Sequence, residues 1–368
     1  MTNNIGGRVD NHWQNVIIKL CLKRVSRVKR TKLHIGGGAS MVSIREVAKL
    51  AQVSPATVSR VINGTAKVDD EKKERVLRVI SETGFVPNEV ARSLFKKSAK
   101  IIGLILPSIK NPFFTQMASA IEKTADASGY RLVLCNTGNS PDKELSALQM
   151  LTSMNADGII LTTSNEQIHE YIENCKIPVI ITDRRLAIDG ACYVHSDHYE
   201  GGRQAAEHLI DCGCKSIVCI KGPQDISSAR ARYEGYSKVC NEKNIKLQTV
   251  DCDYDFNAGL EVTEKILKKF PDVDGIVACN DIVAISIYKV LHKKGIKVPE
   301  DIQLIGFDNI SLSELLTPEL TTIAQPIEEI GAKAAELIIN RDEELTEREF
   351  TFETELIIRE TTKLKGDR

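Results

Sequence analysis

Residues 42–64 read VSIREVAKLAQVSPATVSRVING, and this stretch predicts two short helices joined by a tight turn. Ser43, followed three positions later by Glu46, forms a capping box, so the first helix begins directly after this serine. Ser54 can cap a second helix that begins with Pro55, where the missing N–H costs nothing, and the final glycine can end that helix. The spacing is that of a helix-turn-helix, whose second helix reads the major groove of DNA.

The two helices sort their side chains into an apolar face and a polar face. The apolar positions, which we expect to point inward, are Ile44, Val47, Ala48 and Ala51 in the first helix and Val58, Val61 and Ile62 in the second. The cap and outer face of the second helix supply the candidate DNA contacts Ser54, Pro55, Ala56, Thr57, Ser59, Arg60 and Asn63. Arg60 is the candidate for a bidentate contact to guanine. The alternative is an ordinary helical hairpin with a solvated face.

A third helix is expected from about Asp70 to Thr83, ending at Gly84. Its inward positions are Val76, Leu77, Val79 and Ile80. The string FVPNEVARSLFKKSAK, residues 85–100, follows directly. With the helix-turn-helix, this string resembles the LacI/GalR family of transcriptional regulators, and the resemblance extends from Val42 to the C-terminus.

The resemblance implies a hinge helix from Asn88 to Phe95 that forms on DNA. The contacts implied there are Asn88, Ala91 and Leu94, and two such helices would enter the minor groove side by side, with their leucines opening a central base step. Alone, this hinge is too short to persist as a helix in water. The alternative for Leu94 is an ordinary helix contact. Its flanking basic residues favour DNA; they are Arg92, Lys96, Lys97 and Lys100.

Charge is divided unevenly along the chain. Lys and Arg outnumber Asp and Glu by 8 to 1 in residues 1–40 and by 12 to 7 in residues 41–100, whereas residues 101–368 carry 29 against 42. These counts add up to the 49 basic and 50 acidic residues of the chain, whose formal net charge is −1. A basic head attracts phosphates and an acidic body is repelled by the duplex, so this division suits DNA binding.

Residues 1–40 do not fit the family pattern. We expect Met41 to be the biological start and residues 1–40 to be a non-native or disordered extension, with a short basic DNA-binding arm as the alternative. The run Val16 to Leu22 is too short and too charged to span a membrane, and no cleavage site follows it. Several of the ten cysteines fall in apolar runs, which favours reduced, buried thiols. These features predict a cytoplasmic protein.

From Lys100 onward the chain alternates apolar runs with helical periodicity, the pattern of a parallel α/β architecture. The expected strands are IIGLILP (101–107), YRLVLCN (130–136), DGIILT (157–162), PVIITD (178–183), SIVCIKG (216–222), DGIVACND (274–281) and IQLIGFDN (302–309). Such runs suit strands covered by helices on both faces, and about 270 residues exceed one core, so we expect two lobes.

The expected fold class is α/β, with an all-α helix-turn-helix head and a two-lobed body that resembles periplasmic binding proteins and contains parallel sheets. The head comprises residues 41–87, the hinge and linker 88–99, and the effector-binding and dimerisation body 100–368. Within the body, we expect the N-lobe at about 100–195 and 320–342. The C-lobe is then expected at about 196–319 and 343–368.

In an open parallel sheet a ligand lies beyond the carboxyl ends of the strands, and polar side chains recur there in this chain. They are Asn111, Asp183, Arg184, Arg230, Asn280, Asp308 and Gln325, joined by the aromatic pair Phe113 and Phe114. Carboxylates accept from hydroxyl groups, arginine donates to them, and an aromatic face can cover the C–H side of a sugar ring. The set predicts a site for a small polyhydroxylated ligand.

These nine residues also resemble the pocket of the periplasmic ribose-binding protein, which implies that they hold a ribose-like sugar. Tyr254 departs from that pattern, because it stands where the pocket would use Phe, and its hydroxyl would add a hydrogen bond or select a different sugar. Arg232 is an alternative to Arg230 as the inward-pointing arginine. Structural roles are also open: an ion pair for Asp183 and Arg184, core packing for the two phenylalanines, and a helix cap for Asn280.

We predict no catalytic site, no metal site and no cofactor. The motifs GxGxxG, GxxxxGK[ST], HExxH and GxSxG are absent from the sequence, and the histidines are scattered. The expected function is that of a homodimeric repressor that binds double-stranded operator DNA and is released by ribose or a related sugar. Two alternatives are a global catabolite regulator with a phosphorylated carrier protein as co-repressor, and a purine-type system in which the ligand promotes DNA binding.

Overall fold

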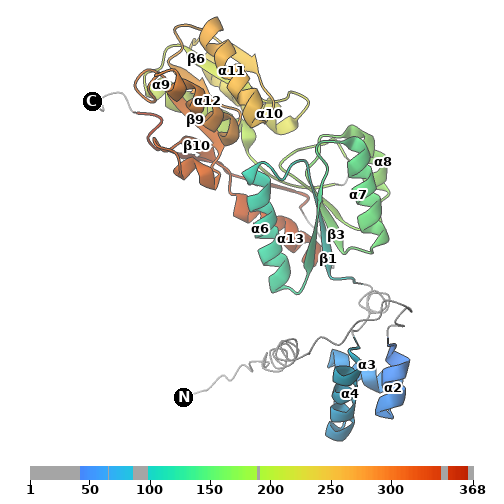
Figure 1. Cartoon of the computed structure of the whole chain (residues 1–368). Coiled ribbons are helices and arrows are strands. Elements are labelled where there is room, and N and C mark those ends of the chain that lie inside the picture. Colours follow the sequence, from blue (N-terminus) through green and yellow to red (C-terminus); the bar gives the residue numbers. More distant parts are fainter. Residues whose placement is uncertain (1–41, 65, 86–97, 189–190, 341–346, 364–368) are drawn as a thin grey trace, which may run out of the picture. The chain divides into compact units, whose positions relative to one another are not determined.

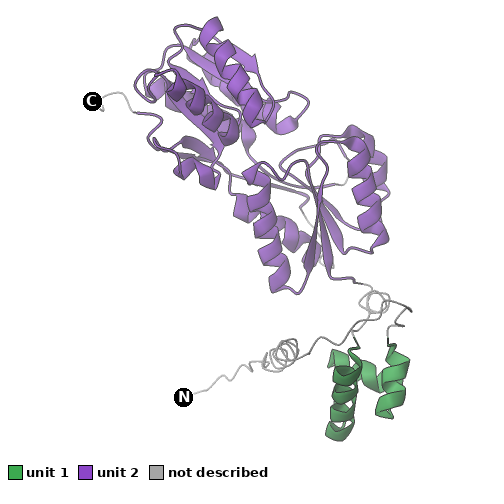
Figure 2. Ribbon diagram, viewed as in Figure 1, with its two compact units in different colours: residues 1–87 green, residues 88–368 purple. Residues whose placement is uncertain are grey.

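The computed structural model describes residues 42–64, 66–85, 98–188, 191–340 and 347–363. The chain forms two compact units, Met1–Pro87 and Asn88–Arg368, which Figure 2 colours separately. The predicted extension, residues 1–40, lies outside the described residues, as do Asn88, Ala91 and Leu94 of the predicted hinge. Within the described part of the chain, no helix is both long enough and apolar enough to cross a membrane.

The described part of the head holds the helices α2 (Ile44–Ala51), α3 (Pro55–Asn63) and α4 (Asp70–Thr83), labelled in Figure 1. Both predicted caps are present. Ser43 and Glu46 form the reciprocal capping box, and the Ser54 hydroxyl accepts from the Thr57 amide at 3.1 Å. Gly64 ends α3 with a φ of +63°, a backbone conformation that favours glycine.

The core of the head consists of Val47, Ala48, Ala51, Val58 and Val76, with Val61, Ile62, Val79 and Ile80 partly buried around it. Two predicted core positions are wrong, because Ile44 is 36% exposed and Leu77 is 38% exposed. Ile44 lies at the very start of α2, and Leu77 is turned about 100° away from the buried Val76. In a unit of this size each short helix buries only a narrow stripe of its surface, so apolar residues beside that stripe stay partly exposed.

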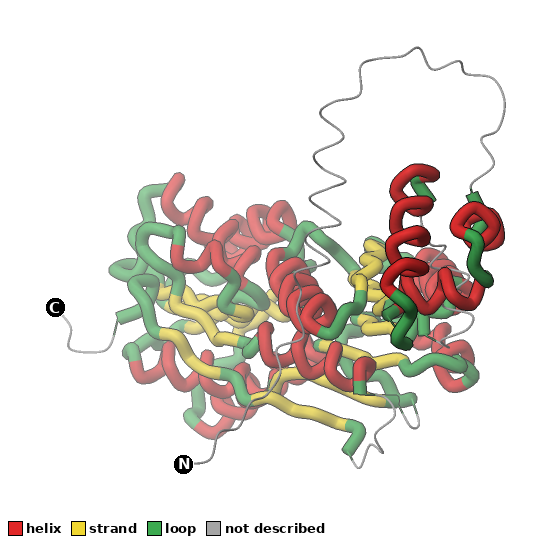
Figure 3. The backbone as a smooth tube through the Cα atoms, turned by 90° about the horizontal axis from the view of Figure 1, so that it is seen from below, coloured by secondary structure: helices red, strands yellow, loops and turns green. Residues whose placement is uncertain are grey.

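The N-lobe is a sheet with the strand order β11-β5-β4-β3-β1-β2, in which every strand pair is parallel. Its strands are β1 (Ile101–Leu106), β2 (Arg131–Asn136), β3 (Gly158–Leu161), β4 (Val179–Thr182), β5 (Cys192–Ser196) and β11 (Glu349–Phe352). Helices α6 (Pro112–Ala127) and α13 (Ile327–Ile339) pack together on one face. Helices α7 (Pro141–Ser153) and α8 (His169–Glu173) pack on the other, so the sheet is covered on both sides (Figure 3).

The C-lobe repeats this architecture with the strand order β12-β10-β9-β8-β6-β7. Its strands are β6 (Ile217–Lys221), β7 (Gln248–Asp251), β8 (Gly275–Val277), β9 (Gln303–Asp308), β10 (Thr321–Ala324) and β12 (Glu355–Ile357), which pairs antiparallel with β10. Helices α9 (His198–Asp211) and α10 (Ser227–Glu242) cover one face. Helices α11 (Phe256–Lys269) and α12 (Asp281–Lys293) cover the other.

The predicted division of the body into lobes is wrong at two strands. β10, which the range 320–342 assigns to the N-lobe, pairs with β9 of the C-lobe. β11, which the range 343–368 assigns to the C-lobe, pairs with β5 of the N-lobe. The chain therefore passes between the lobes after β5, β10 and β11. Short strands of mixed composition carry no local signal of the sheet that they join, because strand pairing is a long-range contact.

All seven predicted strands are present. β5, β7, β10, β11 and β12 lie outside the predicted set, because each is short and mixes polar with apolar side chains, as in CYVHS at 192–196. The consequence is functional. The polar residues that follow β5 are therefore absent from the predicted strand-end positions, and one of them, His198, belongs to the cluster described below.

Candidate effector cleft and DNA-binding face

The outer face of α3 carries the predicted DNA contacts. Ser54, Pro55, Ala56 and Arg60 are exposed, and Thr57, Ser59 and Asn63 are half-buried. The Asn63 amide Nδ2 donates to the Ser59 carbonyl at 2.8 Å, and the Ser54 and Thr57 hydroxyls are hydrogen-bonded at 2.9 Å. These short polar groups are thus already engaged within the helix. Arg60 is the long, exposed donor of this face.

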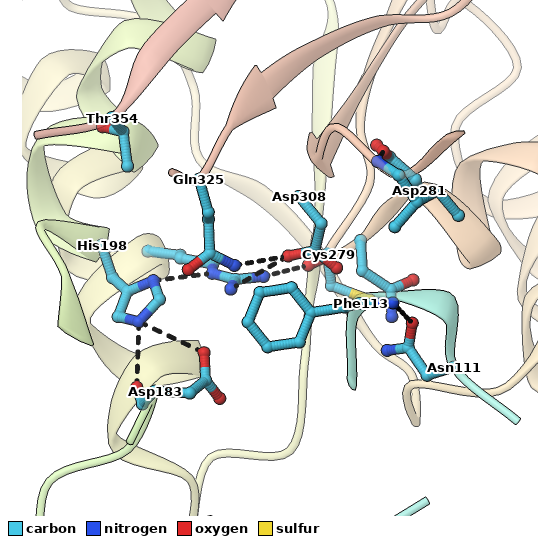
Figure 4. Close-up of polar contacts among 12 residues, drawn as sticks. Asn111, Phe113, Asp183, His198, Cys279, Asp281, Asp308, Gln325 and Thr354 are labelled. Atoms are coloured by element: carbon cyan, nitrogen blue, oxygen red, sulfur yellow. Dashed lines mark hydrogen bonds and ion pairs between the residues drawn. The ribbon is translucent and has the colours of Figure 1, made fainter. Parts of the chain in front are cut away.

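Polar side chains from both lobes meet in one buried cluster, drawn in Figure 4. Asp183, which follows β4, comes from the N-lobe. The C-lobe contributes His198 at the start of α9, Arg232 in α10, Asp308 at the end of β9 and Gln325 after β10. Three of the predicted effector residues, Asp183, Asp308 and Gln325, are therefore brought together, and all three are buried.

Arg232 is the centre of this cluster. Its Nη1 donates to the carbonyl oxygen of Cys279 at 2.8 Å, its Nη2 lies 3.4 Å from Asp308 Oδ1, and its Nε lies 3.4 Å from His198 Nδ1. The guanidinium also stacks on Phe307, with 3.7 Å between Cζ and the ring centroid. A cation held by a carboxylate, a carbonyl and an aromatic face is fixed in position rather than mobile.

The two carboxylates of the cluster sit on unusual backbone. Asp183 has a φ of +64° and Asp308 a φ of +112°, in a region that costs a residue with a side chain about 1–3 kcal/mol. Burial raises the pKa of both, to about 8 for Asp308, although Arg232 opposes the shift. Gln325 Nε2 donates to Asp308 Oδ1 at 2.7 Å. Buried carboxyl groups on strained backbone, with raised pKa values, are typical of ligand-binding sites.

His198 is the member of the cluster that the sequence analysis missed. Its Nε2 lies 3.0 Å from the carbonyl oxygen of Asp183 and 3.6 Å from Asp183 Oδ1. Burial, assisted by the neighbouring Arg232, lowers the pKa of this imidazole well below its usual value. The signal that identifies His198 is its place directly after β5, in the same strand-end position as the other cluster residues.

Two glycines bring α9 and α10 into backbone contact. A Cβ at Gly202 would collide with the carbonyl oxygen of Arg232, and a Cβ at Gly235 would collide with the carbonyl oxygen of Tyr199. Because both positions lack a side chain, the two helices approach closely and align His198 with Arg232.

Of the two arginines that the sequence left open, Arg232 points into the cluster, whereas Arg230 is exposed, donates to the Gln224 carbonyl at 2.8 Å and lines a cavity between the lobes. Residues two apart on a helix do not share a face, so only one of the pair can point inward, and it is Arg232. Arg184 is buried, and its Nε lies 3.8 Å from Asp183 Oδ2. Its Nη1 reaches Ser164 Oγ at 3.5 Å, so it flanks Asp183 on the N-lobe side of the cluster.

Several of the predicted effector residues have structural roles in the fold. Asn111 Oδ1 accepts from the Phe113 amide at 3.1 Å and caps α6, and Asn280 Oδ1 accepts from the Val283 amide at 2.8 Å and caps α12. Phe113 and Phe114 are buried in the N-lobe core, edge to face with 5.1 Å between ring centroids. Figure 4 shows the Phe113 ring drawn among the polar contacts of the cluster.

Four buried polar atoms around the cluster have no hydrogen-bond partner among the described residues. They are Asp183 Oδ1, Arg184 Nε, Tyr254 Oη and Gln325 Oε1. The Tyr254 ring packs over Gly222, where a Cβ would lie 2.7 Å from its Cζ. Buried polar groups are almost always paired in folded proteins, so a concentration of unpaired donors and acceptors marks the place of a missing hydrogen-bonding ligand.

A cavity of about 520 Å³ opens between the lobes, and its lining includes Ser164, which Arg184 contacts. Ser164, Glu166 and Arg185 line it from the N-lobe, and Asp225, Ser227 and Arg230 from the C-lobe. The Arg185 amide donates to Ser227 Oγ at 2.7 Å across this opening. A second cavity, of about 930 Å³, lies between α6 and α13, and Gln325 is among its lining residues. Among the described residues, no group of His, Cys, Asp and Glu is arranged to hold a metal ion.

Comparison with known families gives two matches. Residues 43–88 match the bacterial regulatory proteins of the lacI family, and residues 99–359 match the periplasmic binding proteins and sugar binding domain of the LacI family. A ribose operon repressor of Halalkalibacterium halodurans is 42% identical over 325 residues, which are 88% of this chain and 98% of that protein. A ribose operon repressor of Bacillus subtilis is 35% identical, over 88% of this chain and 99% of that protein.

Solved structures show the same likeness. A lac repressor dimer bound to operator has a TM-score of 0.78 at 25% identity, over 88% of this chain and 99% of that one. A LacI-type regulator from Alkaliphilus metalliredigens, complexed with D-xylulofuranose, has a TM-score of 0.66 at 38% identity, over 72% and 99%. A LacI-family regulator from Enterococcus faecium, with bound ribose, has a TM-score of 0.65 at 30% identity, over 71% and 98%.

Proposed function

The chain belongs to the LacI family of bacterial regulatory proteins, and we propose on this premise that it represses a sugar-utilisation operon and leaves its operator when a ribose-like sugar binds between its lobes. The head binds the operator through α3, with Arg60 as the candidate reader of guanine. The body binds the sugar through Asp183, Arg184, Arg232, Asp308 and Gln325. Because the operator is in the bacterial cytoplasm, we expect the protein there.

One observation carries the effector proposal: four buried polar atoms in and beside the cluster have no hydrogen-bond partner among the described residues, and they include both donors and acceptors. Arg184 Nε can only donate, Asp183 Oδ1 and Gln325 Oε1 accept, and the Tyr254 hydroxyl does either. A sugar hydroxyl also donates and accepts, so a polyol can satisfy all four atoms. Two carboxylates face two guanidinium groups, Arg184 and Arg232, and this balance favours an uncharged sugar over a sugar phosphate.

The proposed mechanism couples the two units. Closure of the lobes around the sugar changes the separation of the N-lobes in a homodimer and pulls the hinge segments apart, so sugar and operator each weaken the binding of the other. The contacts proposed for Asn88, Ala91 and Leu94 stay predictions, because they lie outside the described residues. Dimerisation follows from the two-fold symmetry that helix-turn-helix proteins share with their operators.

Isothermal titration of the full chain against D-ribose, D-xylulose, ribose 5-phosphate and hypoxanthine tests the effector proposal. We expect saturable binding of a free sugar, weaker binding of the phosphate, and release of a duplex that the protein has selected from a random pool. Operator affinity that rises with hypoxanthine would establish the purine-type alternative. If none of these compounds binds, and if operator affinity rises when a phosphorylated carrier protein is added, the catabolite-regulator alternative is established.

A further inference from the structure

We propose that His198 is a positioning residue that links Asp183 of the N-lobe to Arg232 of the C-lobe, so that sugar-driven closure reaches the operator-bound head partly through this imidazole. The inference rests on the proposed function. Its geometric basis is that one buried side chain spans the two lobes, with Nε2 3.0 Å from the Asp183 carbonyl oxygen and Nδ1 3.4 Å from Arg232 Nε.

The contacts of His198 define its tautomer. Arginine Nε carries a hydrogen and can only donate, so His198 Nδ1 accepts and the ring proton resides on Nε2. Nε2–H then donates to the Asp183 carbonyl oxygen. A neutral imidazole provides an acceptor at one end and a donor at the other, which is the combination that this bridge requires. With both nitrogens engaged by the protein, His198 acts through its neighbours rather than by touching the sugar.

His198 connects Asp183, which has strained backbone, with Arg232, whose guanidinium is fixed by several contacts. Asp183 has left-handed backbone, with a φ of +64°, so its carbonyl direction depends on the contacts made around it. Arg232 is tied to Cys279 and Asp308 and stacked on Phe307. The His198 ring also packs against Phe307, with 6.1 Å between centroids. A shift of Asp183 on sugar binding is therefore passed to Arg232 and Asp308 without an intervening gap.

Three substitutions separate the halves of the bridge. In His198→Gln the amide reaches the depth of Nε2 and keeps a donor for Asp183, but the acceptor for Arg232 is lost. In His198→Asn the amide oxygen keeps the acceptor for Arg232, but the side chain no longer reaches Asp183. His198→Phe removes both contacts and retains the ring that packs on Phe307. The matched control is His208→Phe, which removes another buried histidine of α9, one that contacts Thr362 at 2.8 Å.

The readout is the coupling ratio, defined as the operator dissociation constant in saturating ribose divided by that without ribose. We expect His198→Phe to lower this ratio about tenfold, the Gln and Asn variants to fall between it and the wild type, and His208→Phe to leave it unchanged. Ribose affinity by titration should fall far less than the ratio. A wild-type ratio in His198→Phe would overturn the proposal, as would a loss of ribose affinity that accounts for the whole change.

A second measurement needs no sugar. Nitrogen-15 spectra of the histidines in the full chain should show His198 protonated on Nε2 only and neutral from pH 6 to 8. A ring protonated on Nδ1, or one that titrates near the ordinary pKa of histidine, would overturn the proposed bridge. Where His198→Phe does not fold, as judged by its circular dichroism, the Gln and Asn variants decide the matter. Absence of any ribose response in the wild type would instead refute the proposed function.

Discussion

The guanidinium of Arg232 lies against the carboxylate of Asp308, with 3.4 Å between Nη2 and Oδ1, and both side chains are largely removed from solvent. Arg230, two residues earlier on the same helix, is exposed and donates to the Gln224 carbonyl instead. Only Arg232 of these two neighbouring arginines therefore contacts the buried cluster. The contrast provides a pair of matched substitutions.

Arg232→Ala should weaken ribose binding by about 1.5–3 kcal/mol, because it removes a charged hydrogen-bond donor and leaves Asp308 buried without its cation. Arg230→Ala changes a residue that lines the neighbouring cavity but is exposed and donates to Gln224, so it should lose much less ribose affinity than Arg232→Ala. Isothermal titration of both variants measures the difference. The reverse order of effects would show that α10 has been assigned the wrong inward face.

Ribose affinity should rise with pH between 7 and 9. Burial raises the pKa of Asp308 to about 8 despite the opposing charge of Arg232, so the sugar-free carboxyl is mostly protonated at neutral pH. The ionised carboxylate accepts from sugar hydroxyls through both oxygens and more strongly than the protonated carboxyl does. Binding therefore releases a proton and is favoured as the pH rises through this pKa. Titrations in two buffers of different ionisation enthalpy report the released proton, and Asp308→Asn should abolish most of the dependence.

The same group affects the stability of the sugar-free protein in the opposite direction. Its pKa in the folded protein lies above the ordinary value of 3.8, so the folded state binds the proton more tightly than the unfolded state. This contribution to the free energy of unfolding is complete below pH 3.8 and is lost as the pH rises through about 8. Asp308→Asn should therefore gain stability relative to the wild type as the solution becomes alkaline. Chemical denaturation at pH 6 and pH 9 makes the comparison.

Tyr254→Phe should reduce ribose affinity by about 0.5–1.5 kcal/mol without destabilising the sugar-free protein, because the lost hydroxyl has no partner among the described residues. Tyr236→Phe is the matched control. Its hydroxyl donates to the Ile217 carbonyl at 3.2 Å, so this variant should lose stability and keep its ribose affinity. Thermal unfolding and titration of both variants give the four values. Equal destabilisation of the two would mean that the Tyr254 hydroxyl is paired without sugar.

Arg60→Ala should weaken operator binding by about 1–3 kcal/mol and relax the base preference at one position of each half-site. Arg78→Ala changes an exposed arginine of α4 and serves as the control for general loss of positive charge. Fluorescence anisotropy at one fixed salt concentration, with the selected duplex and single-base variants of it, measures both effects. An equal loss on every duplex would reduce Arg60 to a phosphate contact.

Local chemistry was readable from the sequence. The caps at Ser43 and Ser54 involve residues three positions apart, so the hydrogen bonds observed there follow from spacing alone. The strand-end positions of Asp183 and Asp308 follow from apolar runs of a few residues, and in each lobe the parallel strands bring such ends to one edge of that lobe's sheet. Each of these inferences depends on neighbours in the chain.

Tertiary structure alone decided which side chains meet. Arg232 points inward because Gly202 and Gly235 let α9 and α10 touch through their backbones, which sets the rotation of α10. His198 enters the cluster because β5 joins the N-lobe sheet between β4 and β11, although its own residues carry a weak strand signal. The lobes exchange β10 and β11 through pairing with distant strands. Sequence periodicity predicts that a segment is helix or strand, but the direction of a side chain and the partner of a strand depend on packing between segments far apart in the chain.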